Sequence, residues 1–168
     1  LLDYVSGADF EPSVDGITLV QSYIVAPNQT ITRVESIGRK LAYAVRVDTS
    51  KGFEPCRADV CALDDSTCMA DAAPRFAFEV VDGFAESDLG QLLVPRMQTV
   101  MADEGLDVAA FEFILDPDGR PYVYDINTNT NYNSDAESRA GVSAMGQLAA
   151  YLGDELEARY PAELRSAS

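Results

Sequence analysis

Apolar and polar residues alternate over two short stretches in the second half of the sequence, on either side of a tight turn. Residues 107–115 and 122–127 are rich in aromatic and β-branched side chains, which are typical of β-strands. The residues between them, Asp116-Pro117-Asp118-Gly119, are those that turns prefer. The sequence therefore predicts a β-hairpin here.

The register of this hairpin follows from which residues can share an apolar face, because a slip of one residue sends every side chain to the opposite face. An even loop centred on Asp118-Gly119 pairs Glu112 with Asp125, and Ala110 with Asn127. It also makes one continuous apolar face from three pairs, Phe111–Ile126, Phe113–Tyr124 and Leu115–Tyr122. An odd loop would put Glu112 beside Tyr124 and divide the acids between the faces, so the even register is preferred.

Two carboxylates and an amide then share the polar face of the hairpin, from Glu112, Asp125 and Asn127. Directly opposed residues have Cβ atoms roughly 5 Å apart, and like charges there are destabilising. We therefore expect a cation between them, and oxygen ligands suit Mg²⁺ or Mn²⁺ rather than zinc. The alternative is that these acids only keep an exposed sheet edge soluble.

Residues 30–37 and 40–47 predict a second hairpin around Gly38-Arg39, a two-residue loop with glycine first, which suits a type II′ turn. In this register Arg33, Glu35 and Arg46 share one face. Guanidinium groups bind phosphate oxygens through paired hydrogen bonds, so the two arginines are candidates to bind a polyanion. The alternative is a surface hairpin in which Arg33 and Glu35 form ion pairs worth about 0–1 kcal/mol.

The remaining sequence predicts strands and helices around these hairpins. The apolar run over residues 17–25 has the length of a buried strand, and residues 76–81 that of a short one. One helix is expected over residues 87–102, with Ser87 as its N-cap and a kink or new turn at Pro95. Its apolar side comprises Leu89, Leu92, Leu93, Met97 and Val100.

A second helix, of roughly twenty residues, is expected to end at Arg159, before Pro161. Its buried side comprises Val142, Met145, Leu148, Ala149, Leu152 and Leu156. The elements together indicate an α+β fold, an antiparallel sheet with helices packed on one face.

Residues 105–133 resemble the C-terminal metal-binding segment of the ATP-grasp ligases, especially the branch like the ribosomal-protein glutamate ligases. In that family an acid on one strand and an acid-x-Asn on the next hold Mg-ATP. Glu112, Asp125 and Asn127 stand at those positions. The family often continues with an x-x-Pro-Gly turn, whereas this chain continues with residues 128–133, TNTNYN, in which Asn129 is a candidate substrate contact.

The same resemblance extends back to residue 17. It implies that Gln21, Ser22, Tyr23 and Ile24 form the hinge that binds adenine, although the family commonly has Glu where Ser22 stands. It also implies that Arg33 and Arg46 contact the nucleotide phosphates or an acyl phosphate. The alternative for the hinge segment is a plain core strand.

The function that the resemblance implies is ATP-dependent ligation of a carboxylate to an amine or a thiol through an acyl phosphate. The cofactors would be ATP and Mg²⁺ or Mn²⁺, and the substrate a small carboxylate, an amine or a peptide. The alternative is a non-catalytic binding or scaffold domain with a degenerate ATP-grasp fold. A homo-oligomer built on the C-terminal helix is a further option.

The resemblance also bears on domain organisation. The family's phosphate-binding lysines lie on an N-terminal subdomain before the hinge, and this sequence starts just before the hinge. We therefore expect residues 1–168 to be the C-terminal part of the fold, unlikely to turn over alone. It would consist of a lead-in (1–16), the hinge with the nucleotide and metal sheet (17–133) and a C-terminal helix (134–168).

Composition narrows the possible partners. With 28 acidic and 12 basic residues the net charge is −16, which argues against nucleic acid and anionic membranes. It also repels ATP, so the arginines and the metal must compensate locally. The sequence has no histidine, which excludes Ser-His and Cys-His catalysis and most zinc sites.

Cysteines and location complete the sequence-based expectations. Cys56, Cys61 and Cys68 form no CxxC pair and are expected to be reduced thiols, with a cysteine pair or metal site as the alternative. No stretch approaches the ~18 apolar residues of a membrane span, and no signal peptide opens the sequence. A cytoplasmic location is therefore expected.

Overall fold

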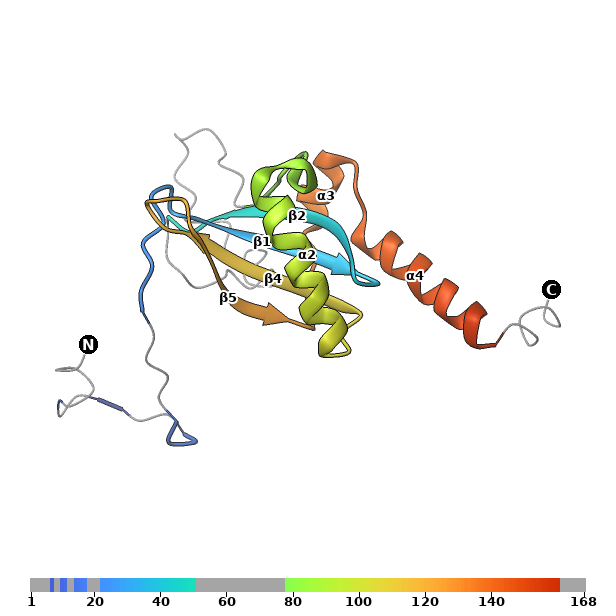
Figure 1. Ribbon diagram of the computed structural model, residues 1–168, viewed down its shortest axis with the longest axis horizontal. Helices are drawn as coiled ribbons and strands as arrows, with labels where there is room; N and C mark the ends of the chain where they lie inside the picture. Colours follow the sequence, from blue (N-terminus) through green and yellow to red (C-terminus); the bar gives the residue numbers. More distant parts are fainter. Residues whose placement is uncertain (1–6, 8–9, 12–13, 18–21, 51–77, 161–168) are drawn as a thin grey trace, which may run out of the picture.

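The computed structural model describes residues 7, 10–11, 14–17, 22–50 and 78–160. They form one five-stranded antiparallel sheet with the strand order β3-β2-β1-β4-β5. The strands are β1 (Thr30–Ile37), β2 (Lys40–Asp48), β3 (Phe78–Val80), β4 (Val108–Leu115) and β5 (Pro121–Asn127). The α+β class and the antiparallel sheet are thus confirmed (Figure 1).

A short 3-10 helix, η1 (Phe84–Glu86), leads into α2 (Asp88–Asp103), which covers one face of the sheet. Ser87 is the predicted N-cap, and its hydroxyl accepts a hydrogen bond from Gly90 N–H at 3.0 Å. The helix continues past Pro95. Its buried side is formed by Gly90, Leu93, Met97 and Met101.

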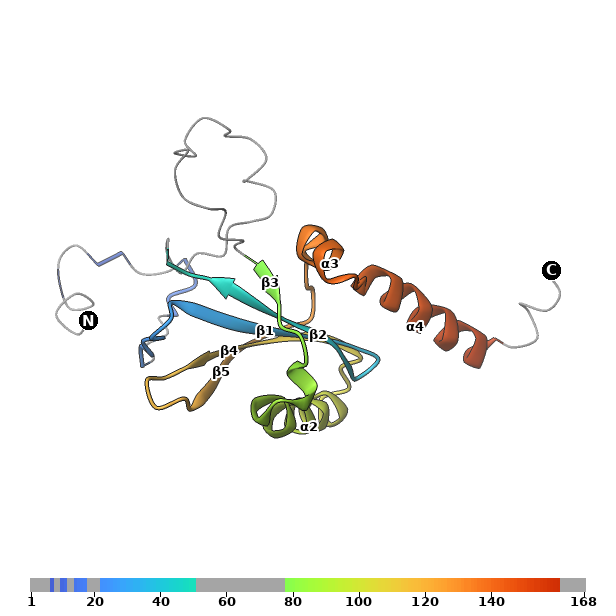
Figure 2. The ribbon, with the colours of Figure 1, turned by 90° about the horizontal axis from the view of Figure 1, so that it is seen from above.

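Two apolar clusters lie on opposite sides of the sheet. The first joins α2 and η1 to β1, β2 and β4 through Val34, Ala44, Phe84, Leu93, Met97, Met101, Ala109, Phe111 and Phe113. The second lies on the other face, and its buried residues are Ile37, Tyr43, Val45, Ala136 and Ala144. Figure 2 shows α2 on one side of the sheet and α3 (Ser134–Ala140) near one end of it. The second face is therefore covered only in part, and its remainder carries polar residues.

Residues 134–159 form two helices rather than the single predicted one. Gly141, with φ 69°, ends α3, and the Ser143 side chain caps α4 (Ala144–Arg159) by accepting from Gly146 N–H. Most of the predicted buried side of α4 is exposed: Met145, Leu152 and Leu156 have exposed fractions of 61%, 55% and 49%. Figures 1 and 2 show the reason, since α4 extends away from the sheet.

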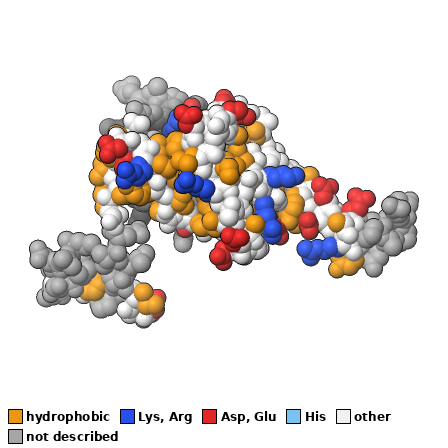
Figure 3. All heavy atoms as spheres, in the orientation of Figure 1, with side chains coloured by type: hydrophobic (Ala, Val, Ile, Leu, Met, Phe, Trp, Pro, Cys, Tyr) orange, Lys and Arg blue, Asp and Glu red, His pale blue; other side chains and the backbone are white. Residues whose placement is uncertain are grey.

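The side of the molecule that carries α2 also exposes apolar residues. Leu92 and Val100, on the predicted apolar side of α2, are exposed, as are Val123 and Ile126 of β5. Figure 3 looks onto this side and shows hydrophobic side chains at its surface. None of the helices in the described residues combines the length and the apolar composition that a membrane span requires.

The predicted strand over residues 17–25 is wrong for the residues that can be checked. Ile17 and Ser22 to Val25 have no strand assignment. Tyr23 is 79% exposed. Residues 18–21, with Gln21, and the three cysteines lie outside the described residues.

The β1–β2 hairpin differs from its prediction in both turn and register. Gly38 and Arg39 both have positive φ, 58° and 61°, as a type I′ turn requires and a type II′ turn does not. Arg39 is held in this conformation because its N–H donates to the Asp107 carbonyl and its guanidinium lies 2.8 Å from the Asp107 carboxylate. The register then shifts by one residue between Glu35 and Ser36.

The β4–β5 hairpin has a three-residue loop, because Asp116 N–H donates to the Arg120 carbonyl across Pro117-Asp118-Gly119. Near this turn the predicted pairs Phe113–Tyr124 and Leu115–Tyr122 are wrong, since Phe113 faces Val123 and Leu115 faces Pro121. A one-residue register shift between Glu112 and Phe113 then removes the difference between the predicted and the observed pairs. Beyond it the predicted pairs are confirmed: Phe111–Ile126, Glu112–Asp125 and Ala110–Asn127.

Candidate functional site

Polar residues from three neighbouring strands form two adjacent rows on the sheet face opposite α2. In the first row Arg33 of β1 pairs with Glu112 of β4, which pairs with Asp125 of β5. In the second row Glu35 pairs with Ala110, which pairs with Asn127. Directly paired residues share a face, so the sheet brings one arginine, three carboxylates and an amide together. We call this set, with Thr130, the acidic face.

Arg33 lies at the centre of the acidic face and contacts three acceptors. Its Nε lies 2.7 Å from Glu35 Oε1 and its Nη1 lies 3.7 Å from Glu112 Oε1, while its Nη2 donates to Thr130 Oγ1. Among the described residues, the Nε–H has no acceptor in hydrogen-bonding geometry, so its short contact with Glu35 is an ion pair rather than a hydrogen bond. Arg33 therefore offsets part of the negative charge of Glu35 and Glu112.

Glu35 lies beneath this surface and is only 2% exposed. The Thr130 hydroxyl lies within hydrogen-bonding distance of both Glu35 oxygens, at 2.9 and 3.0 Å. Burial raises the pKa of the Glu35 carboxyl above its ordinary value of 4.5, and the charge of Arg33 opposes this shift. Glu35 and Thr130 thus tie β1 to the segment that follows β5. The sequence reasoning placed Glu35 on this face but missed Thr130, for which residue spacing carries no signal.

Tyr124 is a second residue of the site that sequence reasoning missed. Its hydroxyl donates to Glu112 Oε2 at 2.9 Å. Burial, and then the Glu112 carboxylate, raise the pKa of Tyr124 well above 10.0, so the phenol stays protonated. Sequence reasoning assigned Tyr124 to the apolar face because it assumed an unbroken register.

The donor chemistry of Glu112, Asp125 and Asn127 suits a hard divalent cation. Asp125 is exposed, Asn127 Oδ1 accepts from Asn129 N–H at 2.8 Å, and each Glu112 oxygen keeps a lone pair beside its present contact. The described residues contain no group of three or more His, Cys, Asp or Glu side chains that could hold a metal. The candidate ligand set therefore needs the Asn127 amide as its third donor.

The structure does not bring all the predicted site residues together. Arg46 pairs with Thr32 and lies on the face opposite to Arg33, because the register shift in β1–β2 turns it over. It is exposed, and its Nη1 lies 3.6 Å from Glu79. The prediction that Arg33 and Arg46 share a face is therefore wrong. Asn129 is exposed and follows Asn127 by two residues. Its backbone N–H donates to the Asn127 side chain.

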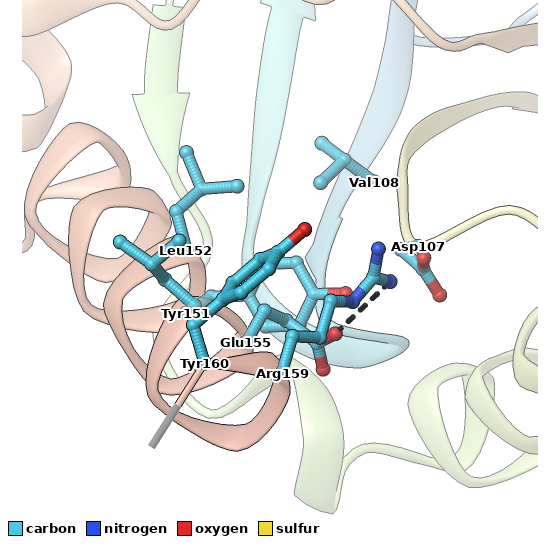
Figure 4. A pocket seen from close by; sticks show the side chains of 8 residues that line it. Asp107, Val108, Tyr151, Leu152, Glu155, Arg159 and Tyr160 are labelled. Carbon is cyan, nitrogen blue, oxygen red and sulfur yellow. Dashed lines mark hydrogen bonds and ion pairs between the residues drawn. The ribbon is translucent and has the colours of Figure 1, made fainter. Parts of the chain in front are cut away.

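Two further features include none of the proposed metal ligands, although Tyr43 in the first of them is the cross-strand partner of Glu35. Tyr43 donates to Glu137 Oε1 at 2.7 Å, and the same oxygen accepts from Ala144 N–H, which fixes α3 and the start of α4 to β2. A groove of about 390 Å³ lies between α4 and the start of β4. Figure 4 shows it lined by residues from Asp107 and Val108 to Tyr151, Leu152 and Tyr160, with none of the predicted site residues.

Comparisons with known proteins give a structural likeness only. No protein-family model and no curated protein matches the sequence. One similar solved structure is the ATP-grasp ligase PsnB complexed with a minimal precursor, with 18% identity over 76% of this chain and a TM-score of 0.47. Another is the macrocyclase MdnC from Microcystis aeruginosa MRC, bound with precursor peptide MdnA, with 14% identity over 64% of this chain and a TM-score of 0.39.

A third similar structure is a RiPP-associated ATP-grasp ligase from Chryseobacterium gregarium in complex with ADP and a leader and core peptide. It has 17% identity over 63% of this chain and a TM-score of 0.41. This chain spans 34%, 24% and 27% of the PsnB, MdnC and Chryseobacterium chains.

Proposed function

We propose that this chain is part of an ATP-grasp ligase and binds Mg-ATP on its acidic face. One observation carries the proposal: Glu112 and Asp125 are direct cross-strand partners, with Asn127 two residues further along β5 and Arg33 next to Glu112 on β1. Like charges so placed cost stability, and a bound cation would remove this cost. The substrates would be a carboxylate and an amine or thiol, on a small molecule or a peptide.

In this proposal Glu112, Asp125 and Asn127 hold Mg²⁺, which when bound neutralises the phosphates of ATP. Arg33 has five N–H donors and keeps some for an anion after its contacts with Glu35, Glu112 and Thr130. Its charge would offset the charge that develops on a transferred phosphoryl group. Arg46 lies on the other face and is given no part. Adenine binding by residues 21–24, substrate binding by Asn129 and a cytoplasmic location stay predictions.

The first experiment is calorimetric titration of the chain with ATP, with and without Mg²⁺. We expect binding that requires Mg²⁺ and that is weakened about 10-fold or more in Asp125→Asn, which removes one charged ligand. Asp154→Asn, on the exposed surface of α4, makes the same change of charge far along the chain and is expected to bind as the unaltered protein does. ATP binding that does not depend on Mg²⁺, or an equal affinity of Asp125→Asn and Asp154→Asn for ATP, would contradict the proposal.

A second candidate function is a binding or scaffold domain without catalysis. The contacts of Arg33 with three protein acceptors favour it, because a purely structural role would engage the guanidinium in this way. This candidate predicts no Mg-dependent ATP binding by folded protein. The same titration therefore distinguishes the two functions.

A further inference from the structure

Tyr124 reaches the acidic face because of the bulge in β5. In an unbroken register it would face Phe113 on the side that α2 covers. Instead Glu112 pairs with Asp125 and Phe113 with Val123, which leaves Tyr124 as the extra residue between them. Bulges beside functional sites commonly redirect a side chain in this way. Here the redirected hydroxyl donates to Glu112.

The Glu112 carboxylate is consequently held from two sides. Tyr124 donates to Oε2 at 2.9 Å, and Arg33 Nη1 lies 3.7 Å from Oε1. The tyrosine contact is the shorter of the two and is directional. Without it, the longer contact with Arg33 would be the one that remains for the Glu112 carboxylate among the described residues. The side chain could then rotate away from the space it shares with Asp125.

We propose that Tyr124 is a positioning residue, whose hydrogen bond orients Glu112 for metal binding. This inference rests on the proposed function, since it assumes that Glu112 is a ligand. Groups that orient metal ligands typically contribute about 10- to 100-fold to metal affinity. Tyr124→Phe keeps the ring and removes only the hydroxyl that donates to Glu112, so it tests this contribution.

The chain offers a matched control in Tyr43. Its hydroxyl also donates to a glutamate, Glu137, at 2.7 Å, but this pair joins β2 to α3 and includes none of the proposed ligands. Tyr43→Phe therefore removes the same atom and the same kind of hydrogen bond. It is expected to lower the melting temperature without changing metal affinity.

The test is titration of the whole chain with Mn²⁺ and with Mg²⁺ in the presence of ATP, by calorimetry and, for Mn²⁺, by electron paramagnetic resonance. We expect Tyr124→Phe to weaken the affinity for both metals about 10-fold or more, with Tyr43→Phe unchanged. Thermal unfolding of each variant verifies that it is folded. Affinity of Tyr124→Phe equal to that of the unaltered chain would overturn the inference, as would an equal loss in Tyr43→Phe.

The outcomes separate the inference from the proposed function. If the unaltered chain binds metal with ATP and Asp125→Asn weakens it, but Tyr124→Phe does not, only the role of Tyr124 is wrong. If the unaltered chain binds neither metal with ATP, the proposed function fails and the role of Tyr124 fails with it.

Discussion

The two hairpins of the sheet each contain a one-residue register shift, and the shifts have opposite consequences. In β1–β2 the shift lies between Glu35 and Ser36, and it separates Arg33 from Arg46 onto different faces. In β4–β5 the shift lies next to Glu112, and it leaves Glu112 paired with Asp125. The position of a bulge relative to polar residues thus decides which side chains can act together.

The largest expected effect compares the ion pairs made by the two arginines that the first bulge separates. Arg33 and Glu35 are 16% and 2% exposed, and breaking a buried ion pair typically costs about 3–5 kcal/mol. Glu35→Ala should therefore lower the free energy of unfolding, measured in urea, by about that amount. Arg46 and Glu79 are 50% and 67% exposed, so Arg46→Ala should cost about 0–1 kcal/mol. A similar loss of unfolding free energy in both variants would contradict the expected difference between the buried and the exposed ion pair.

The sequence predicts the pairing of Glu112 with Asp125 well because large apolar residues next to them determine the register. Phe111 and Ile126 fix the register next to Glu112 and Asp125. The bulges are harder to predict, because the residues around them suit either face. Ala42 and Ala44 are small and apolar in either register, and Tyr124 combines an apolar ring with a polar hydroxyl. An argument from apolar faces therefore cannot locate the shifts.

The C-terminal helices show a different limit. Gly141 and Ser143 are a typical helix stop followed by a typical N-cap, so the break between α3 and α4 had a sequence signal that the apolar periodicity obscured. Periodicity also predicts an apolar side for α4 without predicting what covers it. Met145, Leu152 and Leu156 form such a side and are exposed. Local patterns thus specify the helix better than its packing.

A smaller effect compares the turns of the two hairpins. Gly38 and Gly119 both have positive φ, 58° and 78°, and an L-residue there costs about 1–2 kcal/mol. A Cβ on Gly38 would also lie 2.8 Å from the Tyr151 ring of α4, whereas nothing lies within 4 Å of one on Gly119. Overpacking typically adds about 1–3 kcal/mol. Gly38→Ala should therefore destabilise the protein more than Gly119→Ala in chemical unfolding, and the opposite order would contradict the packing of α4 on this turn.

The smallest expected effect is the pH dependence of the buried pair. Because burial raises the pKa of Glu35, the folded protein keeps the proton at pH values where the unfolded chain has lost it. The resulting stability is complete below the ordinary value of 4.5 and is lost as pH rises through the raised pKa. The Gln side chain of Glu35→Gln does not ionise, so the variant does not undergo this loss. The melting temperature of the variant minus that of the unaltered protein should therefore increase as pH rises over that range. A difference that does not vary with pH would contradict the shift.

The bulge in β5 also bears on how such a site can change in evolution. A three-residue loop and one bulged residue together span the same stretch of chain as an even loop without a bulge. Deletion of one residue between Phe113 and Asp125 could be absorbed by loss of the bulge, which would keep the two acids opposite each other. The hydrogen bond from the tyrosine hydroxyl to Glu112 would then be lost. Homologous sites can therefore differ by one residue in the spacing of their acids, and a sequence motif of fixed length would fail to find some of them.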